Sequence, residues 1–144
     1  MQTSFLASGF LYNLKTRQIL LLQSTEKDDI SFSWSTLRGE SKEGEDTQIT
    51  FQRIVRELLN LELKEKHIYP VYDYFYSTLN KINYVFYAEV KNPPAFISAN
   101  GNTFSWVSFS EIVKLPFSAN SKQDIVVGER VINLKRRQDQ ESAS

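Results

Sequence analysis

Hydrophobic and polar residues alternate in short blocks along the first part of the chain. Residues 5–12 are apolar and β-prone, and a second apolar run follows at 18–23 after a polar turn at 13–17. Two apolar runs joined by a polar turn predict a β-hairpin with a well-buried second strand. The pattern then predicts a polar loop at 24–31, a short strand at 32–37 and a charged loop at 38–45.

The clearest helical pattern begins after that charged loop. Asp46 and Thr47 are both good N-caps, and Asn60 tolerates the left-handed conformation that ends many helices. At 100° per residue, the apolar side chains fall in one arc about 160° wide. A helix from about Asp46 to Asn60 is therefore predicted, and its apolar arc contains Leu61, Ile54, Leu58, Phe51, Val55 and Leu59.

The second half of the chain alternates strand and loop patterns before a final helix. Strands are expected at 69–76, 83–90 and 104–109, with a turn at 79–81 and a loop at 92–102. A C-terminal helix is expected between about Lys122 and Arg136, with Val127, Val131 and Leu134 on one face. Strands around one central helix, plus a terminal helix, predict an α/β (α+β) fold: a mixed β-sheet between helices. We expect one domain at 1–137 and a frayed polar tail at 138–144.

Composition narrows the classes of protein that this chain can represent. With 144 residues, 41% of them hydrophobic and 13% aromatic, the chain can bury one real core. Seventeen basic residues balance seventeen acidic ones, so global charge does not favour a nucleic-acid or membrane partner. The absence of cysteine excludes disulfides and thiolate catalysis. No apolar run reaches the roughly 20 residues that span a bilayer, and we expect a cytoplasmic protein.

The segment from Gly39 to Leu61 resembles the Nudix box. Gly39, Glu45 and Arg53 stand at the separations of that motif, followed by matching apolar positions and Glu57. The resemblance continues outside the box, in the opening hairpin, at Trp34 and from Trp106 onward. It implies a Nudix-type mixed sheet sandwiched between helices, and a MutT-like enzyme that cleaves nucleoside diphosphate derivatives with water and usually Mg²⁺.

The chain departs from the box at the positions that carry the chemistry. Two of its three later acids are replaced, by Ile54 and Leu58, and its second glycine is Asn60. Positions three and four apart lie side by side on a helix, so Glu57 alone remains as a candidate catalytic and metal-binding acid. The loop at 92–105 supplies no further acid, and Gln23 stands where the family often has a basic residue.

The other box residues suggest a structural role. The resemblance implies that Glu45 and Arg53 pair and tie the glycine loop to the helix. Glu40 and Glu43 are spare carboxylates of that loop, and solvated side chains are the simpler interpretation for both. Backbone groups near Arg38 and Gly39 are candidates for contact with a ligand.

Outside the box, aromatic alternation is the main signal. Tyr72, Tyr74 and Tyr76 share one face of a strand, where Tyr74 and Tyr76 either stack on a ligand or belong to an aromatic core. Pro70 comes too early for the Pro of ADP-ribose hydrolases, and Tyr76 lies near the Tyr of dinucleoside polyphosphate hydrolases. We assign a packing or surface role to His67, the single histidine, and a helix C-terminal charge complement to residues 135–137.

Two functional hypotheses follow. The first is a non-catalytic Nudix domain that binds a nucleotide-like ligand or a protein partner and needs no cofactor. The alternative is a weak or atypical pyrophosphohydrolase in which Glu57 holds one Mg²⁺. A purely structural partner domain is a third interpretation.

Overall fold

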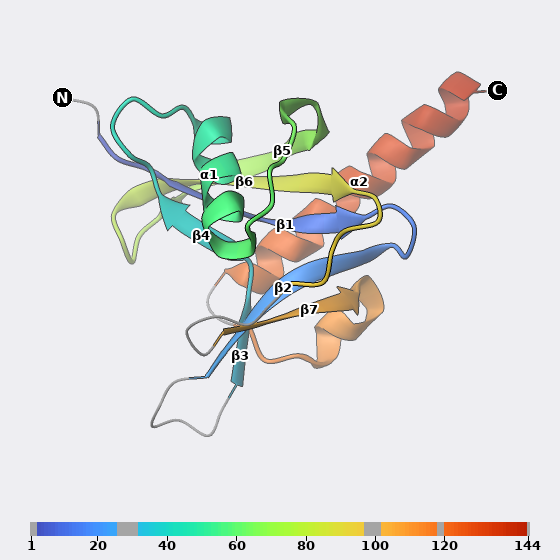
Figure 1. Cartoon of the computed structure of the whole chain (residues 1–144), viewed down its shortest axis with the longest axis horizontal. Coiled ribbons are helices and arrows are strands. Elements are labelled where there is room, and N and C mark those ends of the chain that lie inside the picture. The colour runs from blue at the N-terminus through green and yellow to red at the C-terminus, as the bar shows by residue number, and fades with distance from the viewer. Residues whose placement is uncertain (1–2, 26–31, 97–101, 118–119, 144) are drawn as a thin grey trace.

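The computed structural model describes residues 3–25, 32–96, 102–117 and 120–143. Within them the chain forms seven strands of one sheet, two α-helices and two short 3-10 helices (Figure 1). In chain order these are β1 (Leu6–Asn13), β2 (Gln18–Thr25), β3 (Phe32–Ser35), β4 (Leu37–Glu40), α1 (Thr47–Leu59), η1 (Glu65–His67), β5 (Ile68–Tyr76), β6 (Lys81–Val90), β7 (Asn102–Ser108), η2 (Phe109–Lys114) and α2 (Ser121–Ala143).

Strand β1 is the centre of the sheet. The order is β3-β2-β1-β6-β5, with β4 also paired to β1 and β7 to β2. The β1–β6 pair is parallel, and the other strand pairs are antiparallel. Along one edge of β1, residues Leu6 to Gly9 pair with β4 and residues Leu11 and Tyr12 pair with β2. The predicted mixed sheet is confirmed.

Alternation along the strands divides the core between the two sheet faces. One set of buried side chains, including Ala7, Leu11 and Phe86, packs against α1. The opposite set, including Phe10 and Tyr87, packs against α2. Figure 1 shows α1 in front of the sheet and α2 behind it. The expected sandwich of a mixed sheet between helices is therefore present.

Local signals placed the hairpin and α1 correctly. The Asp46 carboxylate accepts a hydrogen bond from the Ile49 amide at 2.8 Å, and Asn60 ends the helix with φ 54°. These are the capping interactions that the sequence predicted. The β1–β2 and β5–β6 hairpins also lie where the apolar runs indicated, with positive φ at Arg17 and Asn80 in their turns.

Three expectations need correction. The first residues of the expected loop at 38–45 belong to β4, because their backbone pairs with β1. Helix α2 does not end near Arg136 but continues to Ala143, so the described part of the expected tail is helical. Its packed face centres on Ile125, Gly128 and Ile132, while Leu134 is 52% exposed. Of the expected loop at 24–31, residues 26–31 lie outside the described part, as do 97–101 of the loop at 92–102.

Candidate functional site

Arg53 joins three segments around the start of α1. Its Nε donates to Glu45 Oε2 at 2.6 Å and its Nη2 donates to Glu45 Oε1 at 3.0 Å. Nη2 also donates to the Glu40 carbonyl at 2.7 Å, and Nη1 reaches both oxygens of Glu57 at 3.2 and 3.3 Å. We call these four residues the Arg53 cluster. A planar guanidinium suits this arrangement, since its donors lie in a fixed fork.

Glu45 is held in its ionised form by this arrangement. Hydrogen bonding from Arg53 lowers the pKa of Glu45 to about 2, against the opposing effect of burial. The Lys42 amide at 2.7 Å and the Thr50 hydroxyl at 3.1 Å also donate to this carboxylate. Hydrogen bonding to Glu45 in turn raises the pKa of Arg53. The pair fixes the loop before α1 to the helix.

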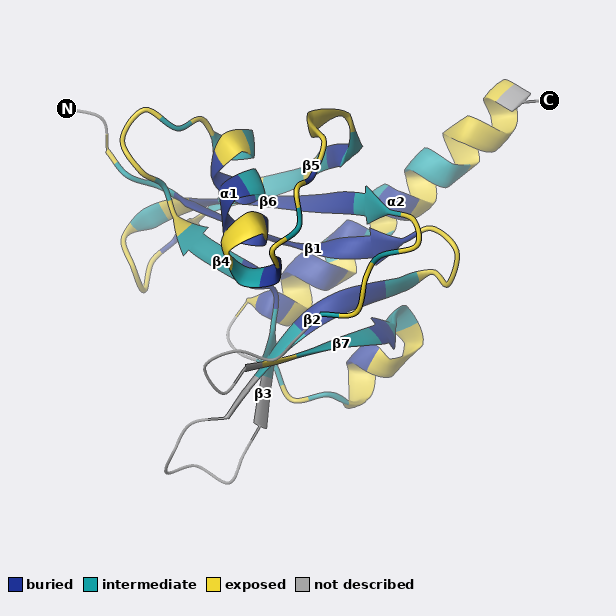
Figure 2. Ribbon diagram, viewed as in Figure 1, coloured by how far each residue is buried: buried dark blue, intermediate teal, exposed yellow. Residues whose placement is uncertain are grey.

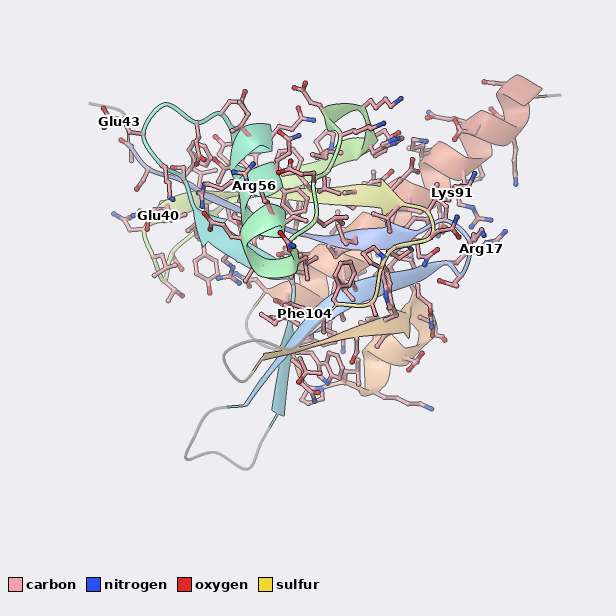
Figure 3. All side chains as sticks on the ribbon, viewed as in Figure 1. Arg17, Glu40, Glu43, Arg56, Lys91 and Phe104 are labelled. Carbon is pink, nitrogen blue, oxygen red and sulfur yellow. The ribbon has the colours of Figure 1, made fainter. Side chains whose placement is uncertain are left out.

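Glu57, the remaining acid of the box, faces two cations. It forms ion pairs with Arg53 at 3.2 Å and with Lys42 Nζ at 3.6 Å, and its side chain is 52% exposed. Glu40 pairs with Lys81 at 3.1 Å, and Glu43 is exposed. Figure 3 shows Glu40 and Glu43 beside the segment that leads into α1. No group of three His, Cys, Asp or Glu side chains able to hold a metal ion exists within the described residues.

Ile54 and Leu58, which stand at two acidic positions of the box, are surrounded by apolar side chains. Ile54 is only 3% exposed and belongs to the α1 core. A Cβ added at Gly39 would lie 2.7 Å from Ile54 Cγ1, so the isoleucine packs directly on the glycine backbone. Leu58 is half-buried against the same core. These residues do not fit the Mg²⁺ that the family resemblance implies, because magnesium binds oxygen ligands.

Beside Leu58, half-buried apolar side chains continue from α1 onto β2 and β7. Phe104 pairs across the sheet with Leu22, and the Phe96 and Trp106 rings lie 6.4 Å apart. Figure 3 shows Phe104 next to the C-terminal end of α1. We call this set the aromatic rim: Leu22, Leu58, Leu61, Phe96, Phe104 and Trp106. The hydrophobic pattern alone did not single out Phe96 or Phe104, although both aromatic residues flank a loop.

The other candidate residues lie on the opposite face of the sheet. Tyr72 and Tyr74 donate to the two carboxylate oxygens of Asp124 in α2, at 2.7 and 3.1 Å. The Arg38 guanidinium lies over the Tyr76 ring, 4.7 Å from its centroid. The structure thus brings Arg38, Tyr74 and Tyr76 together, but it separates them from Gly39, which faces α1.

Asp124 lies at the centre of a buried polar network on that face. Its side chain is fully buried, and this burial raises its pKa. Burial also raises the pKa of Tyr74 to about 12 and that of Tyr72 further. Asn83 donates to the Tyr74 hydroxyl at 3.0 Å and accepts from Ser8 at 3.0 Å. The hydroxyls of both tyrosines are therefore occupied by the protein itself.

Comparisons with known proteins identify the family of this fold. Residues 6–127 match the family model described as NUDIX domain, whereas no curated protein sequence matches the chain. A mutT/nudix family protein from Listeria innocua is 16% identical, with a TM-score of 0.74 over 96% of this chain and 99% of that chain. The NUDIX domain of Shewanella oneidensis NrtR, complexed with ADP ribose, is 13% identical, with a TM-score of 0.71 over 92% and 90%.

A third similar structure is the C-terminal domain of mouse MUTYH in complex with human PCNA. It is 12% identical, with a TM-score of 0.66 over 92% of this chain and 91% of that chain. Identities this low show a shared fold and leave the ligand open. Among the described residues, no helix is long and apolar enough to cross a membrane. Because the family model covers most of its length, the chain belongs to the Nudix family.

Proposed function

We propose that this Nudix domain is non-catalytic and binds a nucleotide-like ligand at the aromatic rim. The observation that carries the proposal is the packing of Ile54 on Gly39. A Cβ at Gly39 would come within 3 Å of two Ile54 side-chain carbons. An apolar side chain thus occupies the space where the family box implies a carboxylate and its metal ion.

The remaining carboxylate does not compensate for that loss. Glu57 has Arg53 and Lys42 as its partners, so a metal ion would compete with two positively charged side chains for this one carboxylate. Magnesium sites usually combine one or two carboxylates with substrate phosphates and several waters. The spare loop acid Glu40 already pairs with Lys81.

The aromatic rim has the chemistry to hold a planar group. Rings such as those of Trp106 and Phe96 stack on a base at about 1–3 kcal/mol per base, without reading its sequence. The similar NUDIX domain of Shewanella oneidensis NrtR was solved with ADP ribose, a molecule that combines a base with a diphosphate. A nucleotide-like ligand that needs no metal is consistent with both observations.

The first test is hydrolysis of a panel of nucleoside diphosphate derivatives with Mg²⁺ or Mn²⁺, read as phosphate release. We expect the wild-type protein and Glu57→Gln to give the same background across the panel. Turnover by the wild type that disappears in Glu57→Gln would overturn the proposal and establish the hydrolase alternative.

The second test is binding of ADP and ADP-ribose, measured by calorimetry in EDTA and again with Mg²⁺. Trp106→Leu keeps an apolar side chain but removes the ring, so affinity should fall about tenfold or more. Trp34→Leu is the matched control, because Trp34 packs against the α2 core. Equal losses in the two variants, or binding that EDTA abolishes, would contradict a metal-free site at the aromatic rim.

A further inference from the structure

Strand β5 forms one edge of the sheet. It is the last strand in the order β3-β2-β1-β6-β5, and within the described residues β6 is its single partner strand. Figure 1 shows β5 beside β6, on the side away from β1. A strand in this position presents a row of backbone N–H and C=O groups that no neighbouring strand binds. Those groups are available to a further strand.

The second half of β5 has few of the features that protect edge strands. Proteins block such edges with lysine, proline or a β-bulge. β5 has Pro70 and a register shift between Pro70 and Tyr72, but the residues from Tyr72 to Tyr76 pair regularly with β6 and include neither lysine nor proline. The Tyr72 hydroxyl donates to Asp124 of α2, which ties this segment to the fold. We call residues 72–76 the open edge.

Apolar side chains are exposed beside the open edge, on the face of the sheet that is turned away from α2. Phe75 is 59% exposed, and Ile82, its partner in β6, is 42% exposed. Leu79, in the turn between the two strands, is 49% exposed. Figure 2 shows this end of the hairpin as mostly exposed. Apolar residues that gather on a surface are typical of contact with another molecule, and we call these three the hairpin patch.

A pocket continues from the open edge towards the start of α1. Its volume is about 310 Å³, and its lining includes Thr47 and Gln48 of α1, Pro70 and Asp73 of β5, and Tyr84 and Phe86 of β6. When a peptide adds a strand to a sheet edge, backbone hydrogen bonds supply affinity and pockets for alternate side chains supply specificity. The edge strand and the pocket beside it provide both parts of such a site.

The charges around this pocket favour a cationic side chain on the partner. Asp73 is the single charged residue of the lining. Its side chain forms no ion pair or hydrogen bond with the part of the chain that the structure describes. Lys81 already pairs with Glu40 at 3.1 Å. Glu65 and Lys66 of the neighbouring η1 lie outside the lining. A lysine or arginine on an added strand would therefore meet a free carboxylate.

We propose that the open edge binds an extended segment of a partner protein, which adds a strand to the sheet. Side chains two residues apart share one face of a strand, so the segment has the order apolar, any, lysine or arginine, any, apolar. Its basic residue meets Asp73, one apolar residue enters the pocket, and the other packs on the hairpin patch. A second copy of this chain fits less well, because its β5 brings another Asp73 and no lysine or arginine.

The test is fluorescence anisotropy of labelled peptides Ser-Val-Thr-X-Thr-Val-Ser, with Lys, Arg, Gln or Glu at X, titrated with the full chain. We expect the Lys and Arg peptides to bind about threefold more tightly than the Gln peptide, and the Glu peptide to bind most weakly. Asp73→Lys should reverse this order. Its thermal unfolding should match the wild type, because Asp73 is exposed and holds no partner in the fold.

Phe75→Lys tests the hairpin patch and the edge together, and it should lower affinity for the Lys peptide about fivefold or more. Leu134→Lys is the matched control, since it changes a similarly exposed leucine of α2 and should bind as the wild type does. Trp106→Leu should also leave peptide binding unchanged, because Trp106 belongs to the aromatic rim. Amide hydrogen exchange at residues 72–76 should slow when the Lys peptide is added.

Three results would overturn the proposal: no binding across the panel, a peptide preference that Asp73→Lys leaves unchanged, or equal losses in Phe75→Lys and Leu134→Lys. Light scattering of the wild type provides a fourth. A dimer that Phe75→Lys abolishes would assign the open edge to a second copy of this chain instead.

Discussion

The α1 face and the α2 face of the sheet each hold an acidic side chain largely out of water, and they do so in opposite ways. On the α1 face, Glu45 is bonded to the Arg53 guanidinium at 2.6 and 3.0 Å, which lowers its pKa to about 2. On the α2 face, the fully buried Asp124 accepts from the neutral hydroxyls of Tyr72 and Tyr74, and its pKa is raised. A neighbouring cation favours the charged form of an acid and lowers its pKa. Hydrogen bonds from neutral hydroxyls also favour the charged form, but for Asp124 they do not fully offset the effect of burial, which raises the pKa.

The difference explains what this Nudix domain has kept of its box. The ion pair of Glu45 and Arg53 fixes the backbone of the loop and of α1, so it is useful whether or not chemistry takes place. Ile54 and Leu58 instead extend the apolar surface of the helix into the core. The Glu45–Arg53 pair thus holds the backbone geometry of the box, while Ile54 and Leu58 add to the apolar core.

The largest expected effect comes from removing the cation of the Arg53 cluster. Arg53→Met should destabilise the fold by about 4 kcal/mol, because Glu45 is left without its partner in a site largely closed to water. Urea unfolding monitored by fluorescence measures this loss. Arg56→Met is the control: its pair with Glu62 is exposed and contributes at most about 1 kcal/mol. A loss no larger than the control's would contradict a central role for Arg53.

Introducing a carboxylate that has no partner should cause the next largest loss of folding stability. Ile54→Glu places a charge against Gly39 and the α1 core, and we expect a loss of about 3 kcal/mol. The half-buried Leu58→Glu should cost less, because its charge can reach water. In Ile54→Glu/Leu58→Glu, calorimetry should detect Mg²⁺ affinity that the wild type lacks. Micromolar Mg²⁺ binding by the wild type would contradict the interpretation of a lost metal site.

Glu45→Gln tests the pH dependence on the α1 face. Because the folded pKa of Glu45 is lowered from 4.5 to about 2, its ionised form stabilises the fold above pH 4.5. The stability advantage of the wild type over the variant should be about 2–3 kcal/mol at neutral pH and should vanish as the pH falls towards 2. Unfolding free energies from urea titrations across this range measure it. A difference independent of pH would show that charge is not the cause.

Asp124→Asn should show the opposite sign and a smaller effect. The folded pKa of Asp124 is raised above 3.8, so its contribution is most favourable below that pH and is lost as pH rises through the folded pKa. The wild type should therefore lose stability relative to the variant as pH rises from 3.8. Tyr72→Phe, which removes one hydrogen bond to Asp124, should cost about 1 kcal/mol at neutral pH. A wild-type advantage that grows with pH would contradict this assignment.

Local sequence features were sufficient to predict the positions of several helices and strands. The caps at Asp46 and Asn60 determine both ends of α1 within the segment itself, and the β1–β2 hairpin follows from two apolar runs and one turn. β4 escaped prediction because Leu37–Glu40 is short and charged, and it becomes a strand by pairing with β1, about thirty residues earlier in the chain. The length of α2 was underestimated because its polar end needs no packed face in order to be helical.

The sequence by itself indicated the family, the central helix and the apolar residues at two box positions, because each depends on residue identity at fixed spacing. Only the tertiary structure decided what surrounds those positions. It placed Ile54 on Gly39, gave Glu57 two cationic partners, bonded Tyr74 to Asp124 of α2 and stacked Tyr76 under Arg38. Alternation along a strand says which side chains share a face, but which helix covers that face depends on packing between residues distant in the chain. The sequence also could not show that the C-terminal part of α2 extends past the sheet (Figure 1), because this depends on where the sheet ends in the folded protein.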